Sequence, residues 1–188
     1  MNQTDYKPGP LANVEYRVND GRWTLVFTRE FTHSPEKVWE ALTNPAHQRE
    51  WAPFESDRNL SSTGTASFKM IDSDKQMVFD ANVTRADAPG LLEYTWGTDL
   101  LRWELRATGA GTQLVLRHTT AGKDWLPKVA AGWHICLDVA GYFMDGSPIG
   151  RIVGEAAKEH GWIELNDAYA EKLGITSTGW PEDLGRSR

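Results

Sequence analysis

Apolar and polar residues alternate along most of the chain, a pattern typical of half-buried strands. The first alternating segment spans residues 14–18 and leads to an Asp-Gly dipeptide at 20–21, which favours a tight hairpin turn. The strand after the turn places Phe27 on its apolar face, and Arg29 shares that face. The pattern therefore predicts a hairpin that carries a permanent charge on the side that should be buried.

Two helix-start signals follow the hairpin. Ser34 and Asn44 each precede a proline. Their side chains can accept a hydrogen bond from a free backbone N–H, and proline is tolerated at the first helical position. We therefore expect two short helices in succession, the second ending near Trp51.

Five or six short alternating segments come next, separated by turn residues. They lie near residues 54–60, 64–71, 76–86, 91–97, 100–108 and 112–119. Each segment has one apolar face, and the connections between segments are short. We therefore expect an antiparallel sheet with one side in water and the other side covered.

Helical spacing returns after the strands. From Asp124, which we expect to cap the helix, apolar residues recur every three or four positions as far as Met144. A serine-proline pair predicts a further helical stretch over 147–159, and a last short helix is expected over 162–173. This order predicts an α+β fold with helices on one side of a single curved sheet.

The chain of 188 residues is expected to form one domain, since domains hold roughly 150 residues. No repeat, low-complexity run or Gly/Ser linker interrupts the sequence. We expect a flexible lead over 1–13, the main domain over 14–146 and a C-terminal helical extension packed on the same domain over 147–173. A tail with an exposed Trp180 follows over 174–188.

The charge balance bears on partners and location. Twenty Lys and Arg against 26 Asp and Glu give a net charge of −6, whereas nucleic acids and anionic membranes require a basic surface. We expect neither as a partner. The longest apolar stretch, residues 130–144, is shorter than the about 20 residues that cross a membrane. The single Cys136 and a polar N-terminus without signal-peptide features predict a cytoplasmic protein.

Arg29 and His118 are the two polar residues on the inward faces of otherwise apolar strands. A buried guanidinium needs a carboxylate, carbonyl groups or cavity water to meet its charge. Two interpretations are open. The residues belong either to a satisfied structural network or to the polar end of an apolar ligand cavity.

Nine tryptophans are many for this length, and large aromatic side chains suit either a bulky core or the wall of an apolar cavity. Trp96, Trp103 and Trp133 all face inward by their spacing. Plain core and cavity lining are both open for them. The candidate ligand-binding residues are Arg29, Phe79, Tyr94, Trp96, Trp103, His118, Trp133 and Leu137.

His134 and Asp138 lie four positions apart on the expected long helix, the spacing of a base and its orienting carboxylate. No nucleophile accompanies them, and we favour a solvated helical pair. Cys136 lies in an apolar segment and is expected to be a small hydrophobe. The five histidines lack metal-ligand spacing and no phosphate-binding glycine loop is present, so we expect neither a metal site nor a cofactor.

Several spaced segments agree, in order, with one known group of proteins. They are Arg29–Phe31, Ser34–Thr43, Trp51, Leu92–Trp96, Trp103–Leu105, Gly111–Thr119 and Gly132–Trp133. Through them the chain resembles the START-like superfamily (SRPBCC, polyketide cyclase-like), in the branch of homologues of the heat-shock-protein-ninety ATPase activator. The resemblance implies a helix-grip fold, in which a curved antiparallel sheet wraps around a long C-terminal helix.

The functions that the resemblance implies include carriage of hydrophobic molecules, cyclase-type catalysis and chaperone partnership. Our leading hypothesis is a non-enzymatic binder of a small hydrophobic or aromatic molecule, held between the sheet and the long helix. One alternative is a cyclase or hydrolase with His118 or His134 as the proton-transfer group. The other is a protein-interaction module related to the chaperone activators. A protein partner and a homodimer both stay open.

Overall fold

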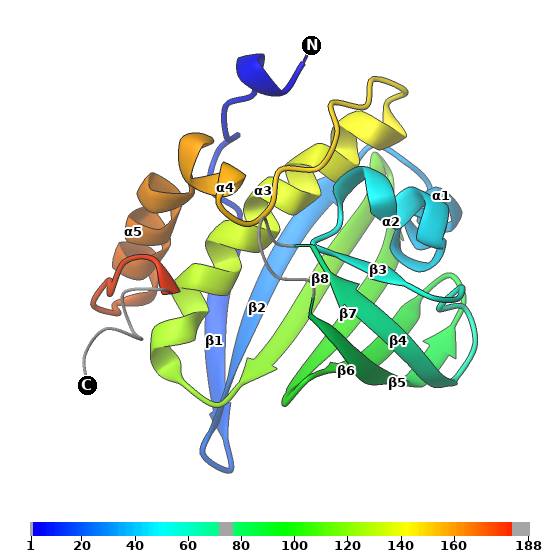
Figure 1. Cartoon of the computed structure of the whole chain (residues 1–188), viewed down its shortest axis with the longest axis horizontal. Coiled ribbons are helices and arrows are strands. Elements are labelled where there is room, and N and C mark those ends of the chain that lie inside the picture. Colours follow the sequence, from blue (N-terminus) through cyan, green and yellow to red (C-terminus); the bar gives the residue numbers. More distant parts are fainter. Residues whose placement is uncertain (1, 72–76, 182–188) are drawn as a thin grey trace.

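One antiparallel sheet curls around a long helix in the computed structural model, which describes residues 2–71 and 77–181 (Figure 1). Within these residues the sheet has eight strands: β1 (Asn13–Asn19), β2 (Arg22–Phe31), β3 (Phe54–Ser56), β4 (Gly64–Met70), β5 (Val78–Asp87), β6 (Leu91–Trp96), β7 (Asp99–Thr108) and β8 (Gly111–Thr120). Their order across the sheet is β1-β2-β8-β7-β6-β5-β4-β3. The expected α+β helix-grip fold is confirmed.

The first hairpin forms where the Asp-Gly dipeptide predicts it. Asp20 and Gly21 both adopt positive φ values, 49° and 74°, as a type I′ turn requires. On its other side β2 pairs with β8, where Leu25 lies opposite His118. This pairing places the N-terminal hairpin beside the last strand, so residues far apart in the chain are neighbours in the sheet.

The two short helices after the hairpin, α1 (Pro35–Thr43) and α2 (Pro45–Trp51), begin at their predicted caps. The Ser34 side chain accepts from the backbone N–H of Lys37, and Asn44 accepts from that of Ala46. The strand expected over 54–60 is shorter than predicted, because the Arg58 guanidinium binds the backbone carbonyl groups of Asn59, Ser62, Gly64 and Thr65 and so holds the connection to β4 in a loop. The start of the strand expected over 76–86, Gln76, lies outside the described residues.

The long helix α3 (Leu126–Met144) lies against the inner face of the curled sheet (Figure 1). Its predicted cap at Asp124 is wrong. A short 3₁₀ turn, Lys123–Trp125, precedes the helix, and Trp125 occupies the cap position without a side-chain hydrogen bond. Asp124 lies inside this turn, one position before the cap, and within the described residues its carboxylate accepts no hydrogen bond from the start of the helix.

The segment after α3 is less helical than the sequence predicts over 147–159, since only α4 (Ala156–Glu159) forms. Gly150 and Gly154 adopt φ values of 78° and 57°, which a right-handed helix does not contain. The last helix, α5 (Trp162–Leu173), forms as predicted and packs against α3. The extension therefore covers the side of α3 that the sheet leaves open (Figure 1).

The N-terminal segment, expected to be a flexible lead, packs on the domain instead. A 3₁₀ turn (η1, Gln3–Asp5) opens it, and the side chains of Tyr6 and Ala12 are buried. The backbone N–H of Ala12 donates to the Tyr169 hydroxyl of α5 at 2.9 Å. Contacts with distant elements therefore hold a segment whose own sequence has no regular pattern.

The C-terminal tail also packs on the domain as far as residue 181. Ile175 is buried, and Trp180 packs against the ring of Trp162 instead of standing exposed. The remainder of the predicted tail, residues 182–188, lies outside the described residues. Among the helices that the structure describes, none is long and apolar enough to cross a membrane.

Candidate functional site

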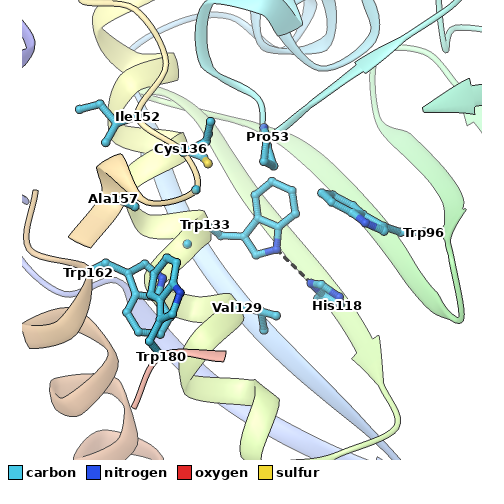
Figure 2. Close-up of a pocket in the computed structure, with 13 residues that line it drawn as sticks. Pro53, Trp96, His118, Val129, Trp133, Cys136, Ile152, Ala157, Trp162 and Trp180 are labelled. Atoms are coloured by element: carbon cyan, nitrogen blue, oxygen red, sulfur yellow. Dashed lines mark hydrogen bonds between the residues drawn. The ribbon is translucent and has the colours of Figure 1, made fainter. Parts of the chain in front are cut away.

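A cavity of about 190 Å³, here called the aromatic pocket, lies beside α3 between the sheet and the C-terminal extension (Figure 2). Its walls come from the connection between α2 and β3, from β6, β8 and α3, and from the chain beyond residue 150. The side chains that define it are Pro53, Trp96, His118, Trp133, Cys136, Ile152, Trp162 and Trp180. An apolar wall with very few polar groups is the usual character of small-molecule sites.

One face of α3 forms the floor of the aromatic pocket. Val129, Gly132, Trp133 and Cys136 recur at spacings of three and four residues and therefore share this face. A Cβ atom at Gly132 would lie 4.0 Å from the indole nitrogen of Trp162. This is an ordinary van der Waals distance, so Trp162 of α5 packs directly against α3 at this position.

His118 of β8 is held at both ring nitrogens. The indole N–H of Trp133 donates to Nδ1 at 3.0 Å (Figure 2). On the other side of the ring, Nε2 lies 2.9 Å from a carboxylate oxygen of Asp99. Because Nδ1 accepts, a neutral ring carries its proton on Nε2 and donates it to Asp99. Neither nitrogen is then free to act on a molecule in the aromatic pocket.

Trp96 lies at the boundary between two cavities. It lines the aromatic pocket and also an outer groove of about 550 Å³ at the open end of the sheet. Phe79 lines only the second of these, with its ring centroid 6.5 Å from that of Trp96. Of the predicted ligand-binding residues, Trp96, His118 and Trp133 therefore come together at the aromatic pocket, and Phe79 is its neighbour.

Three other predicted ligand-binding residues lie in the closed core. Tyr94, Trp103 and Leu137 are each at most 2% exposed, and none of them lines the aromatic pocket. The Trp103 indole donates to the Tyr94 hydroxyl at 3.0 Å, and burial raises the pKa of Tyr94 above its ordinary value. The rings of Trp51 and Trp133 pack edge-on against Trp103, with centroids at 6.5 and 5.1 Å. Large aromatic side chains therefore fill this part of the space between the sheet and α3.

Arg29 lies in a different part of the molecule from His118. Its guanidinium pairs with the buried Asp138 of α3, beside a separate, more polar cavity of about 280 Å³. The two inward-facing polar residues therefore do not form one polar end of a shared cavity. Arg29 has instead the carboxylate partner that a buried charge requires.

The expectation of a solvated pair at His134 and Asp138 is wrong, because both side chains are buried. His134 Nε2 lies 3.3 Å from an Asp138 carboxylate oxygen, and its Nδ1 lies 2.7 Å from the Tyr169 hydroxyl. Tyr6 donates its hydroxyl to Asp138 at 2.9 Å. The N-terminal segment and α5 cover this face of α3. The spacing of His134 and Asp138 shows that they share a helix face, but it does not show that other elements cover that face.

Asp138 stays ionised within this network. Burial by itself would raise the pKa of Asp138, but contact with His134 and the charge of Arg29 outweigh burial and lower the pKa to about 2. The same carboxylate accepts from the backbone N–H of Gly9 at 3.1 Å. One charged side chain of α3 thus joins the helix, the sheet and the N-terminal segment.

Cys136 belongs to the floor of the aromatic pocket, and its thiol does not ionise at neutral pH. Burial raises the pKa of its thiol to about 12, so it stays protonated at neutral pH. It packs as a small hydrophobe, as predicted. Within residues 2–71 and 77–181, no group of three His, Cys, Asp or Glu side chains could hold a metal ion.

The sequence pattern misses the outer wall of the aromatic pocket. Ile152, Trp162 and Trp180 form this wall, and the ring centroids of the two tryptophans lie 4.6 Å apart. Lys158 places its ammonium group 4.4 Å from the Trp180 ring centroid. The high tryptophan content was a signal for an aromatic wall, but local spacing cannot show that these residues face α3.

Residues 32–139, more than half of the chain, match the family described as Activator of Hsp90 ATPase homolog 1-like protein. The chain belongs to this family. The match confirms the resemblance drawn from segments such as Ser34–Thr43. The residues that form the outer wall of the aromatic pocket, Ile152, Trp162 and Trp180, come after the segment that matches this family. No curated protein matches the chain.

Solved structures share the fold of this family member. CalU16 from Micromonospora echinospora is 20% identical, with 85% of this chain and 95% of that chain covered and a TM-score of 0.62. An AHSA1-like protein from Aeromonas hydrophila is 17% identical, with coverage of 66% and 93% and a TM-score of 0.56. DynU16, described as a putative protein in the dynemicin biosynthetic locus, is 21% identical, with coverage of 68% and 49% and a TM-score of 0.58. At these identities the likeness shows the fold alone.

Proposed function

We propose that this family member binds a small apolar molecule, about the size of one aromatic ring, in the aromatic pocket. The observation that carries the proposal is a cavity of about 190 Å³ walled by Trp96, Trp133 and Trp162. An engineered apolar cavity of about 150 Å³ in another protein holds benzene. The volume here therefore suits a single ring with a small substituent.

The geometry of the walls supports the same class of ligand. Trp96 and Trp133 stand nearly perpendicular, at 84°, with centroids 5.5 Å apart. Aromatic rings prefer offset-stacked or edge-to-face contacts, so a ligand ring can use both kinds at once. The hydrogen bond from Trp133 to His118 fixes one wall before any ligand arrives, which lowers the entropy cost of binding.

The enzyme alternative has less support from the site. Proton transfer by His118 would require loss of its hydrogen bond from Trp133 or its contact with Asp99. His134 is fully buried and does not line the aromatic pocket. A chaperone partner is suggested by the family description alone. The proposal also includes a cytoplasmic location, which the single, buried Cys136 supports.

Native mass spectrometry of freshly purified protein, compared with the same sample denatured, gives the first test. Extra mass that disappears on denaturation would identify a bound molecule. Calorimetric titration with toluene then tests the site directly. We expect Trp133→Ala to lower toluene affinity at least tenfold, beyond what its change in thermal stability explains. Trp23→Ala, which removes a half-buried tryptophan away from the aromatic pocket, is the matched control and should bind as the wild type does.

Two results would contradict the proposal. One is the absence of binding to the wild type across toluene, indole and similar single-ring molecules. The other is equal affinity in the wild type and Trp133→Ala. Stimulation of a purified chaperone ATPase by a protein that binds none of these molecules would favour the interaction-module alternative.

A further inference from the structure

We propose that Trp96 determines the size of the molecule that the aromatic pocket accepts, an inference that rests on the proposed function. Its side chain forms the boundary between the aromatic pocket of about 190 Å³ and the outer groove of about 550 Å³. The groove is lined in part by Met77, Phe79 and Trp125. One ring thus divides a small apolar pocket from a larger groove whose lining also includes Thr98, Asp99 and Thr120.

The ring of Trp96 has contacts on both sides of this boundary. Toward the aromatic pocket, its centroid lies 5.5 Å from Trp133 and 6.4 Å from His118, and the His118 ring is tilted by only 23° from it (Figure 2). Toward the groove, it lies 6.5 Å from Phe79 at 30°. The indole therefore fills the space through which the two cavities would otherwise join.

Trp96 is held less firmly than the core tryptophan nearest to it in the sequence. Trp103 is 1% exposed, and its indole N–H donates to the Tyr94 hydroxyl. Trp96 is only partly buried, and its indole N–H has no hydrogen bond within the described residues. It is also the last residue of β6, directly before Gly97, whose φ is 55°. Packing alone keeps the ring at the boundary.

The two cavity volumes indicate which ligands fit when the Trp96 ring divides the pocket from the groove, and which fit when that ring is removed. Pockets for larger organic ligands span about 300–1,000 Å³, so the aromatic pocket alone is too small for a molecule with three fused rings. Joined to the groove, it falls within that range. In the wild-type protein the aromatic pocket therefore selects single-ring apolar molecules, and the ring of Trp96 keeps fused polycyclic ones out of it.

Binding of toluene and phenanthrene to the wild type, Trp96→Ala and Trp23→Ala tests this inference. Phenanthrene fluorescence and calorimetry give the dissociation constants. We expect the wild type to bind phenanthrene at least tenfold more weakly than toluene, and Trp96→Ala to bind phenanthrene at least tenfold more tightly than the wild type. Trp23→Ala removes a half-buried tryptophan that lines neither the aromatic pocket nor the groove, and it should resemble the wild type.

Wild-type protein that binds phenanthrene as tightly as toluene would overturn this inference and leave the proposed function intact. A Trp96→Ala protein that binds toluene without gaining phenanthrene would do the same. If the wild type binds neither toluene nor phenanthrene, the result contradicts both this inference and the proposed function. If circular dichroism shows that Trp96→Ala does not fold, Trp96→Phe serves instead. It should show a smaller gain in the same direction, and no gain would count against the inference.

Discussion

The indole N–H of Trp133 on α3 donates a 3.0 Å hydrogen bond to Nδ1 of His118 on β8, so the long helix and the sheet share one fixed contact at the wall of the aromatic pocket. Both side chains are buried, at 4% and 5% exposure. Asp99 holds the other nitrogen of the histidine ring. The shape of the pocket and the stability of the fold therefore depend on the same pair of residues.

Replacing His118 by phenylalanine should lower the free energy of unfolding by about 1–3 kcal/mol, because the buried indole N–H of Trp133 is left without an acceptor. Urea unfolding followed by circular dichroism measures the change. The double variant His118→Phe with Trp133→Phe removes both partners and should lose less than the sum of the two single variants. Strict additivity in this cycle would show that the hydrogen bond contributes nothing.

Asp138→Asn should destabilise the protein at neutral pH by about 3 kcal/mol, because Arg29 loses its carboxylate partner. The pKa of Asp138 falls from its ordinary 3.8 to about 2 on folding. Its stabilisation of about 2 kcal/mol is therefore complete above about pH 4 and is lost as the pH falls through 2. Urea unfolding at pH 7, 4 and 2.5 should show a flatter acid profile for the variant.

The exposed Asp145, which follows the last turn of α3, supplies the control for this experiment. Asp145→Asn breaks only an exposed contact with His33 and should change stability by about 1 kcal/mol or less. Parallel loss of stability between pH 4 and 2.5 in the wild type and Asp138→Asn would show that Asp138 does not account for acid sensitivity.

Trp180→Ala should weaken toluene binding about threefold to tenfold, the range that loss of one aromatic contact predicts. Its ring lies 4.6 Å from Trp162 in the outer wall and is only partly buried, so the thermal midpoint should change little. Calorimetry and thermal unfolding measure the two effects. Ile163→Ala on α5 removes a half-exposed apolar side chain that does not line the pocket, and it should leave the affinity unchanged.

Cys136 should react slowly with a charged disulfide reagent in the folded protein and rapidly after denaturation. Burial raises the pKa of the thiol to about 12, which leaves almost no reactive thiolate at pH 8. The absorbance of the released thiolate follows the reaction in buffer and in guanidinium chloride. A native rate equal to that of free cysteine would show that the floor of the aromatic pocket is open to water.

The local signals of the sequence predict most of the fold correctly. The Asp-Gly turn at 20–21 and the caps at Ser34 and Asn44 form as expected, because each is decided by hydrogen bonds and φ values within a few residues. The cap at Asp124 fails, since a 3₁₀ turn displaces the helix start. The helix expected over 147–159 is reduced to one turn, since its glycines adopt left-handed conformations.

The candidate site was predictable only in part. Trp96 and Trp103 have the same inward alternation in the sequence, yet Trp96 lines the aromatic pocket and Trp103 fills the core. Arg29 and Asp138 are 109 positions apart, and nothing local to either predicts their pairing. The sequence by itself determined which faces point inward, because that depends on strand and helix periodicity. Only the tertiary structure decided where space remains between those faces, because a cavity is the volume left over after distant elements pack together.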